Sequence, residues 1–379
     1  MTTSCCDASA GPTVRPESAP GAPFFTVTAA RLVENVHSFR THLPGVHPYF
    51  AVKANPEPPV LAVLAAQGVG FEAASLPEIE LLRSLGVDAA RVLFGSAIKP
   101  TGSIAAAYTW GVRLFAVDSA DEVDKLAKFA PGSDILVRIR VNDARSTFAF
   151  GEKFGAEPST GVALVHRALS RGLTPIGFSF HVGSQSMRVD AWAEAVATVQ
   201  PLVQQLADEG VRLRVIDIGG GFPCQYDTAE RVPTLEQIGV RTIDALRALP
   251  GLSVIAEPGR FLVGSAVTLT TTVISRVDRL SGTWLFTDAG CYNGLFEAMS
   301  YQGSIRYPVS VVSGARSLAR GTFHIAGPTG DSADVVARDV CLPVDTGTGC
   351  VLVFENAGAY TMSLCVPFNG FAKPTVHLA

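Results

Sequence analysis

Eight short apolar segments alternate with helical patterns between about residues 45 and 260, and this alternation restricts the possible folds more than any other feature. The segments lack the two-residue polar alternation of half-exposed strands, as buried parallel strands do. Eight such strands separated by helices predict a (β/α)8 barrel, with a doubly wound open sheet as the alternative. The segments are Tyr49–Lys53, Val69–Ala73, Val92–Gly95, Leu114–Val117, Ile135–Val141, Ile176–Val182, Val215–Ile218 and Val254–Glu257.

A further helix is expected before the first strand, where Leu32, Val33, Val36 and Phe39 recur at helical spacing within Ala29–Leu43. The helices expected between the strands are Pro59–Ala66, Pro77–Leu85, Ser103–Trp110, Ala120–Phe129, Val162–Arg171, Ala191–Ala207 and Leu235–Leu249.

After about Leu262 the pattern changes to β-branched and aromatic runs separated by Gly, Ser and Pro, which predicts a mostly antiparallel β domain. The runs are Val267–Val277, Trp284–Thr287, Thr322–Ile325 and Cys350–Phe354. We therefore expect three parts: an N-terminal arm over 1–27 that joins the β domain, a barrel over 28–264, and the β domain over 265–379.

Composition excludes several classes of function. A net charge of -4 argues against a nucleic-acid surface and gives no signal for membrane binding. No apolar run approaches the roughly 20 residues of a membrane span, and the opening segment lacks the pattern of a signal peptide. The seven cysteines show neither metal-ligand spacing nor a disulfide framework, so no metal is expected and the cytoplasm is the expected location.

Lys53 lies at the C-terminal end of the first predicted strand, in Tyr49-Phe50-Ala51-Val52-Lys53-Ala54-Asn55. Active sites of parallel barrels lie at these strand ends. An ammonium beside apolar surface is costly to desolvate, and a lysine with a lowered pKa is suited to imine chemistry with an aldehyde. The structural alternative is a lysine that extends its charged end into solvent.

Other strand ends carry groups that suit one cofactor. Gly219-Gly220-Gly221 offers backbone N–H groups to a phosphate, and Arg260 can add a bidentate contact, although a glycine turn can be purely structural. Glu257 can protonate a pyridine nitrogen, or simply pair with Arg260. His181 can lie against an aromatic ring, or be an ordinary core histidine. Together with Lys53 these groups describe a site for pyridoxal 5'-phosphate.

At this point the chain resembles the fold-type III pyridoxal-phosphate decarboxylases, the ornithine, lysine, arginine and diaminopimelate enzymes, and ornithine decarboxylase-like members most. The resemblance implies an alanine racemase-like barrel followed by a β domain. Besides the Lys53 segment, it rests on Gly70-Phe71-Glu72-Ala73-Ala74-Ser75, Lys153-Phe154-Gly155, Phe180-His181-Val182-Gly183-Ser184-Gln185, Asp217-Ile218-Gly219-Gly220-Gly221-Phe222-Pro223, Glu257-Pro258-Gly259-Arg260, Gly327-Pro328-Thr329-Gly330-Asp331-Ser332-Ala333-Asp334, Gly358-Ala359-Tyr360-Thr361 and Phe368-Asn369-Gly370-Phe371.

The resemblance also implies a role for each matching residue. Lys53 would hold the cofactor as a Schiff base, His181 would stack on its ring, and Glu257 would pair with its ring nitrogen. The implied phosphate ligands are Ser184, Gly220, Gly221, Arg260 and Tyr360, and the remaining implied cofactor contacts are Glu72, Arg138, Gly219 and Gly259.

The resemblance further implies a homodimer with shared active sites. Asp331 would reach into the partner's pocket as a catalytic and substrate-binding residue, and Lys153 and Asp334 match a pair that forms a salt bridge between subunits.

Two positions depart from the family pattern. Gly330 stands where the family has a cysteine that donates a proton to the substrate carbon after CO2 leaves. Gln302, after Tyr301 in the substrate-binding region, stands where the ornithine enzymes carry an aspartate. A water, Thr329 or Ser332 could supply the missing proton, or the space at Gly330 could admit a bulkier substrate.

We therefore expect decarboxylation of an L-amino acid with a polar or cationic side chain. Gly330 keeps two alternatives open within enzymes, decarboxylation coupled to transamination and another pyridoxal-phosphate reaction at Cα. A third alternative is a cofactor-binding protein without catalysis, against which the presence of Lys53, His181, Glu257 and Asp331 argues.

Overall fold

The structure, a computed structural model, describes residues 23–228 and 230–379, which divide into two compact units. The first unit comprises residues 29–225 and 230–266. The second comprises residues 267–379 with the described parts of 1–28 and 226–229. Most of the expected N-terminal arm, residues 1–22, lies outside the described residues.

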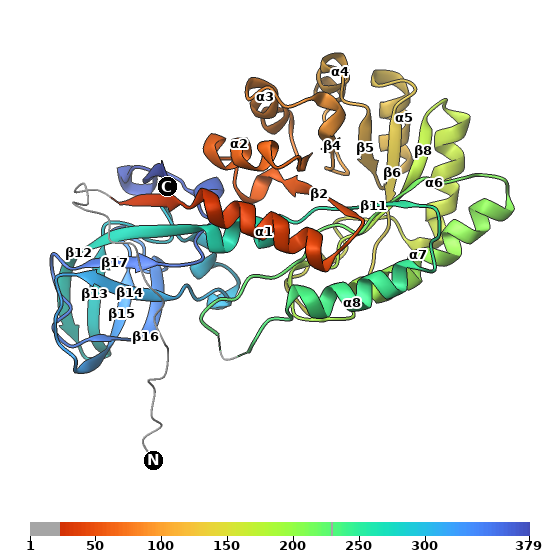
Figure 1. Ribbon diagram of the computed structural model, residues 1–379. Coiled ribbons are helices and arrows are strands. Elements are labelled where there is room, and N and C mark those ends of the chain that lie inside the picture. Colours follow the sequence, from red (N-terminus) through yellow and green to blue (C-terminus); the bar gives the residue numbers. More distant parts are fainter. Residues whose placement is uncertain (1–22, 229) are drawn as a thin grey trace. The chain divides into compact units, whose positions relative to one another are not determined.

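The first unit is a closed barrel of parallel strands, so the predicted (β/α)8 architecture is confirmed and the open sheet is excluded (Figure 1). Each strand pairs in parallel with the strand that follows it around the barrel, and β8 and β6 are adjacent because β7 lies outside the ring. The strands are β2 (Val46–Ala51), β3 (Gly70–Ala73), β4 (Val92–Phe94), β5 (Leu114–Val117), β6 (Asp134–Arg138), β8 (Thr174–Ser179), β10 (Val215–Asp217) and β11 (Ser253–Ala256).

Eight helices pack around the described barrel, and contacts between α1 and α8 close the ring. Capping residues fix the start of several of these helices. The Ser75 and Ser119 hydroxyls accept N-cap hydrogen bonds, and Thr234 forms a capping box with Gln237. The helices are α1 (Ala29–His42), α2 (Pro58–Ala66), α3 (Leu76–Ser84), α4 (Thr101–Trp110), α5 (Ala120–Phe129), α6 (Pro158–Ser170), α7 (Ala191–Asp208) and α8 (Leu235–Leu246).

The structure corrects the environment of Lys53. The strand was expected to run to Lys53, but β2 ends at Ala51 and Val52–Ala54 forms a 3-10 turn. The turn closes when the Asn55 N–H donates to the Val52 carbonyl at 3.0 Å. Because Pro56 follows Asn55 and has no N–H of its own, the chain cannot continue as a paired strand. Lys53 therefore projects from a turn just past the carboxyl end of β2.

The barrel interior is filled by inward-facing apolar side chains from several strands, as in other parallel barrels. Leu93, Leu136, Ile176 and Ile255 form a buried cluster, and Tyr49 packs against it. This layer is the floor beneath the carboxyl ends of the strands, where the predicted site residues lie.

The second unit is a mostly antiparallel β sheet, as predicted, although β13 and β15 and also β1 and β18 pair in parallel. Phe24–Val27 pairs with the start of β12. The sequence patterns missed β1, β14, β16 and β18, which are short or carry polar residues on both faces. The strands are β1 (Phe24–Val27), β12 (Val267–Arg279), β13 (Gly282–Thr287), β14 (Val309–Ser313), β15 (Arg320–Ala326), β16 (Val335–Pro343), β17 (Val351–Phe354) and β18 (Thr375–Leu378).

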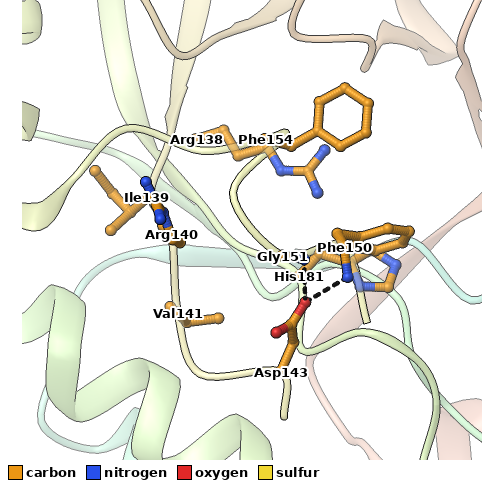
Figure 2. Close-up of a pocket in the computed structure, with 9 residues that line it drawn as sticks. All are labelled: Arg138, Ile139, Arg140, Val141, Asp143, Phe150, Gly151, Phe154 and His181. Carbon is orange, nitrogen blue, oxygen red and sulfur yellow. Dashed lines mark hydrogen bonds between the residues drawn. The ribbon is translucent and has the colours of Figure 1, made fainter. Parts of the chain in front are cut away.

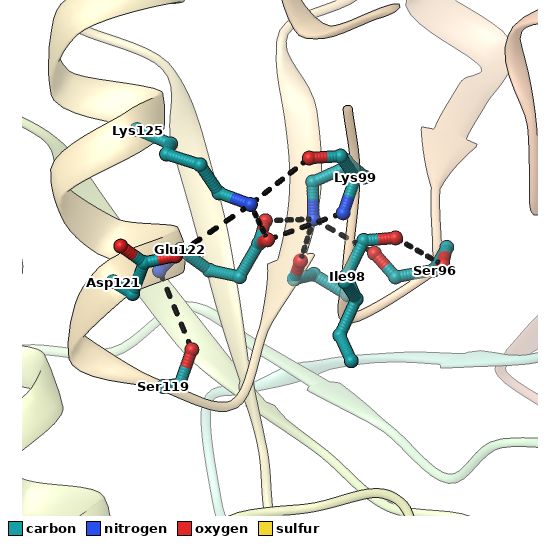
Figure 3. Close-up of polar contacts among 8 residues, drawn as sticks. Ser96, Ile98, Lys99, Ser119, Asp121, Glu122 and Lys125 are labelled. Atoms are coloured by element: carbon teal, nitrogen blue, oxygen red, sulfur yellow. Dashed lines mark hydrogen bonds and ion pairs between the residues drawn. The ribbon is translucent and has the colours of Figure 1, made fainter. Parts of the chain in front are cut away.

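A buried lysine that the sequence did not single out joins the segment after β4 to α5 (Figure 3). The Lys99 side chain is fully buried; its Nζ donates to the carbonyls of Ser96 at 2.7 Å and Ala116 at 2.6 Å, and lies 3.3 Å from Glu122 Oε2. Lys125 forms a second ion pair with Glu122 and donates to the Lys99 carbonyl. Burial lowers the pKa of Lys99 to about 8.

Among residues 23–228 and 230–379, no helix is long and apolar enough to cross a membrane. Within the same residues, no group of three or more His, Cys, Asp or Glu side chains is placed to hold a metal ion.

Candidate active site

Lys53 and Glu72 meet at the carboxyl ends of β2 and β3. The Lys53 Nζ lies 3.1 Å from Glu72 Oε2, and the Lys53 side chain is 39% exposed while that of Glu72 is 3% exposed. A glycine makes room for this carboxylate, because a Cβ on Gly95 would lie 2.5 Å from Glu72 Cγ. The structure therefore presents a partly accessible amine beside a buried acid.

Two acids, the buried Asp217 and the partly buried Glu257, lie side by side at the ends of neighbouring strands. Burial raises the pKa of both carboxyls; the charge of Glu257 raises that of Asp217 further, and Glu72 does the same for Glu257. The backbone joins them at Gly219, whose N–H donates to Asp217 Oδ1 and whose carbonyl accepts from the Glu257 N–H, both at 2.8 Å. Two adjacent carboxyls cannot both ionise readily, so the pair retains a proton.

His181 follows β8 and is held as a neutral imidazole. Its Nδ1 accepts a hydrogen bond from the Gly183 N–H at 3.1 Å, which places the proton of the neutral ring on Nε2. Burial lowers the pKa of His181 well below its usual value, and the nearby charges of Arg138 and Lys53 lower it further. His181 is therefore suited to contact an uncharged or aromatic group.

A loop after β6 brings an aromatic ring against His181 (Figure 2). The Phe150 ring meets the His181 ring edge to face, with centroids 4.7 Å apart, and the Arg138 guanidinium lies 5.2 Å from the centre of the Phe154 ring. Asp143 fixes the loop, because its Oδ2 accepts from the N–H groups of Phe150 and Gly151. The sequence patterns assigned no role to Asp143 or Phe150.

The glycine run after β10 has no room for side chains. Gly219 and Gly221 have φ of +65° and +103°, which favour glycine. A Cβ on Gly220 would lie 2.8 Å from both His181 Nε2 and the Glu257 carbonyl oxygen. These three residues therefore bring bare backbone close to His181 and Glu257.

The second part of the expected phosphate site also lies in the barrel unit. Arg260 begins the short helix α9 (Arg260–Val263) and is buried, with its Nη2 3.4 Å from the Ser184 hydroxyl. Ser184 belongs to the small sheet of β7 (Ser146–Phe148) and β9 (Ser184–Ser186), which the sequence patterns missed. Gly259 lets this segment approach the Lys53 turn, since a Cβ there would lie 3.0 Å from the Ala54 Cβ.

Asp331 lies in the β unit and is held as a carboxylate. The Ala333 N–H donates to its Oδ1 at 2.9 Å and the Tyr292 hydroxyl donates to its Oδ2, and both bonds lower the pKa of Asp331. The Tyr292 ring packs on Phe368 with centroids 4.6 Å apart. Sequence reasoning missed Tyr292, whose only signal was its position after Cys291 in a segment rich in small residues.

Gly330 and Asp334, on either side of Asp331 in the chain, have different surroundings: the first is open and the second is buried. The Gly330 N–H donates to Asn369 Oδ1 at 2.9 Å, and a Cβ on Gly330 would meet only that oxygen, at 3.7 Å, so space beside it is open. Asp334 is buried and accepts from the Cys291 N–H at 2.7 Å and from the Thr329 hydroxyl at 2.7 Å. The Asp334 carboxylate therefore already accepts hydrogen bonds within its own chain. The salt bridge with Lys153 that the resemblance implies would be an additional contact.

Three further predicted contact residues also lie in the β unit. Tyr360 follows β17 and has a φ of +55°. Tyr301 and Gln302 lie in the 3-10 turn Ser300–Gly303, and their side chains are outside the described part of the structure.

The barrel residues suit pyridoxal phosphate in the chemistry of their donor groups. The accessible amine beside an acid matches the aldehyde of the cofactor, and the carboxyl pair that retains a proton matches its ring nitrogen. The neutral histidine matches the face of the ring. The glycine backbone next to a buried arginine matches the phosphate. The fold and these groups together define a barrel enzyme of the pyridoxal-phosphate-dependent class.

Comparisons with known proteins support the same class of enzyme. Residues 29–264 match the family model described as "Pyridoxal-dependent decarboxylase, pyridoxal binding domain". The lysine/ornithine decarboxylase of Selenomonas ruminantium is 35% identical over 355 residues, which cover 93% of this chain and 89% of that protein. The chain therefore belongs to the pyridoxal-dependent decarboxylases.

Solved structures place it in the same group. The lysine/ornithine decarboxylase from Vibrio vulnificus complexed with putrescine superposes with a TM-score of 0.86 at 30% identity, covering 95% of this chain and 94% of that one. The Paramecium bursaria Chlorella virus arginine decarboxylase bound to agmatine gives 0.87 at 26% identity, covering 94% and 97%. The predicted family, amino-acid decarboxylation and pyridoxal-phosphate cofactor are confirmed, and nothing in the comparisons favours the alternatives.

Proposed function

We propose that Lys53 holds the aldehyde of pyridoxal phosphate and that Glu257 faces the ring nitrogen. In this proposal His181 lies against the ring, while Ser184, Arg260, Tyr360 and the glycine run take the phosphate. Glu72, Arg138 and Gly259 are further contacts. When bound, the cofactor supplies an electron sink for the pair left at the substrate Cα when CO2 departs. The main support is the convergence of Lys53, Glu72, His181 and Glu257 at neighbouring strand ends of one barrel.

The residues of this chain would then control protons and charge. Glu72, 3.1 Å from the Lys53 amine, orients it and can exchange a proton with it. Asp217 shares a proton with Glu257, which keeps a proton available at the ring nitrogen. His181 stays uncharged, so it places no second positive charge against the ring.

For the substrate, we propose an L-amino acid with a polar or cationic side chain. In a dimer with shared sites, its distal group would face the partner subunit's Asp331, a residue that Ala333 and Tyr292 hold anionic. The relatives named above are a lysine/ornithine and an arginine decarboxylase, which act on amino acids of this kind. Because Gln302 replaces a second acid, one anionic contact for a short distal ammonium is missing, and the open space beside Gly330 admits a longer side chain.

We expect ornithine to be a poor substrate compared with longer or neutral hydrogen-bonding side chains. One charge-assisted hydrogen bond is worth on the order of 1.5–3 kcal/mol, so its loss should lower kcat/KM for ornithine about ten- to hundredfold. CO2 release by the purified holoenzyme from ornithine, lysine, arginine and citrulline measures this. Gln302→Asp should raise ornithine turnover and Gln302→Asn should not. A preference of the unmodified enzyme for ornithine would overturn this substrate assignment.

We also propose a homodimer with shared sites that works in the cytoplasm. Its support is the family resemblance of Lys153 and Asp331, and a cysteine spacing in the sequence that gives no disulfide framework, as expected in a reducing compartment.

Mixing two inactive variants tests the sharing. Lys53→Ala and Asp331→Ala subunits, once exchanged, should regain about a quarter of the unmodified activity, because half of the dimers are mixed and each mixed dimer has one intact site of two. Native mass spectrometry confirms the exchange. If mixed dimers form and no activity returns, the sites are not shared.

A further inference from the structure

A second cavity lies at the opposite end of the barrel from the site described above. Its lining comes from residues at the amino ends of the strands: His47 and Tyr49 on β2, Gly70 at the start of β3, Arg91 immediately before β4, and Arg40 near the end of α1. The cavity has a volume of about 180 Å³. Lys53 and Glu72, by contrast, lie at the carboxyl ends of the same two strands, so the two sites are distinct.

Within the described residues, neither arginine of this cavity has an acidic partner. Arg91 Nη2 donates to the carbonyls of Ala65 at 2.9 Å and Val69 at 2.5 Å, and Arg40 Nη2 donates to the carbonyl of Gln67 at 2.7 Å. No acidic side chain in the described chain forms an ion pair with either guanidinium. The backbone bonds fix both groups at the end of α2 and leave their Nε and Nη1 donors available.

Two more polar side chains line the cavity. The Tyr49 ring covers Gly70, where a Cβ would lie 2.8 Å from it. Neither the Tyr49 hydroxyl nor the His47 ring makes a hydrogen bond to another described residue. Asp217 acts electrostatically on Tyr49, but it is fully buried, and burial raises the pKa of its carboxyl and so reduces its negative charge at neutral pH. The cavity is therefore lined by hydrogen-bond donors, two of which are guanidinium groups.

We propose that this cavity binds a phosphoryl oxyanion, either the free ion or the phosphate of a small monoester. Guanidinium groups match the oxygens of such an anion with paired N–H donors, and fixed guanidinium groups lose little freedom on binding. The Tyr49 hydroxyl and the His47 ring can add hydrogen bonds. A water takes up about 30 Å³, so a volume of 180 Å³ admits the anion together with several waters or a short ester group.

Calorimetric titration of the holoenzyme tests this, because bound pyridoxal phosphate already fills the phosphate contacts of the active site. Inorganic phosphate and glycerol phosphate serve as separate probes. We expect one site per chain, with affinity lowered roughly tenfold or more by Arg40→Gln or Arg91→Gln. Tighter binding of inorganic phosphate assigns the site to the free ion, and tighter binding of glycerol phosphate assigns it to an ester.

Arg113→Gln is the matched control, because Arg113 Nη1 also donates only to backbone carbonyls, those of Tyr108 and Val112, and lies outside the cavity. Its substitution should leave binding unchanged. If Arg91→Gln fails to fold because it loses its contacts with the end of α2, the exposed Arg40→Gln and His47→Gln carry the test. No binding of either probe, or equal weakening by Arg113→Gln and Arg40→Gln, would show that the cavity is not an anion site.

Discussion

Lys53→Met should reduce CO2 release from every accepted amino acid by roughly 10³-fold or more. Methionine keeps an unbranched side chain one atom shorter but can neither bond an aldehyde nor transfer a proton, and positioned proton transfer alone contributes about 10²–10⁴-fold. Folding should be little affected, because the Lys53 side chain is 39% exposed and projects from a turn. Initial rates of CO2 release, with circular dichroism to confirm folding, measure the effect.

Lys128→Met is the matched control, because Lys128 is an exposed lysine on the outer helix α5 and is not among the residues assigned to the site. It should retain the activity of the unmodified enzyme. A folded Lys53→Met variant with more than a tenth of the original rate would show that another group performs the role assigned to Lys53.

Glu122→Gln should destabilise the barrel unit by about 3–5 kcal/mol, since it leaves buried charge uncompensated. Glu122 is the only acid within ion-pair distance of the fully buried Lys99 in the described chain, and it also pairs with Lys125. Without it, two ammonium groups face each other across a neutral amide (Figure 3). The melting temperature should fall by roughly 6–20 °C at 2–4 °C per kcal/mol.

Asp121→Asn provides the comparison on the same helical turn. Its side chain is 85% exposed and lies 3.7 Å from Lys125, so its removal should cost at most about 1 kcal/mol. Urea unfolding of both variants, followed by circular dichroism, gives the two free energies. Similar small losses for Glu122→Gln and Asp121→Asn would mean that the buried cluster contributes little to the stability of the barrel.

The barrel could be predicted because its periodicity is local. All eight apolar segments became barrel strands, and Ala120–Phe129 was predicted to the residue. Strands that depend on distant partners were missed: β9 contains only Ser184–Ser186 and exists through its pairing with β7. Likewise β2 ends before Lys53 because of the turn before Asn55, which a count of apolar residues does not detect.

The residues that bond directly to the expected cofactor and substrate were predictable, and the residues that hold them were not. Lys53, His181 and Glu257 stand in motifs. Asp217 stands in a motif too, but its effect on Glu257 depends on adjacent strands. Tyr292 meets Asp331 across 39 positions of the chain. Lys99 has no sequence signal, since its burial follows from the packing of α5 against the segment after β4.

The attachment point of the cofactor tests the central claim most directly. The purified chain, incubated with pyridoxal phosphate and reduced with borohydride, can be digested and its peptides identified by mass spectrometry. The account predicts one modified lysine per chain, Lys53, and loss of the visible absorption band on reduction. Modification of a different lysine, or no modification of a folded and fully loaded protein, would contradict it.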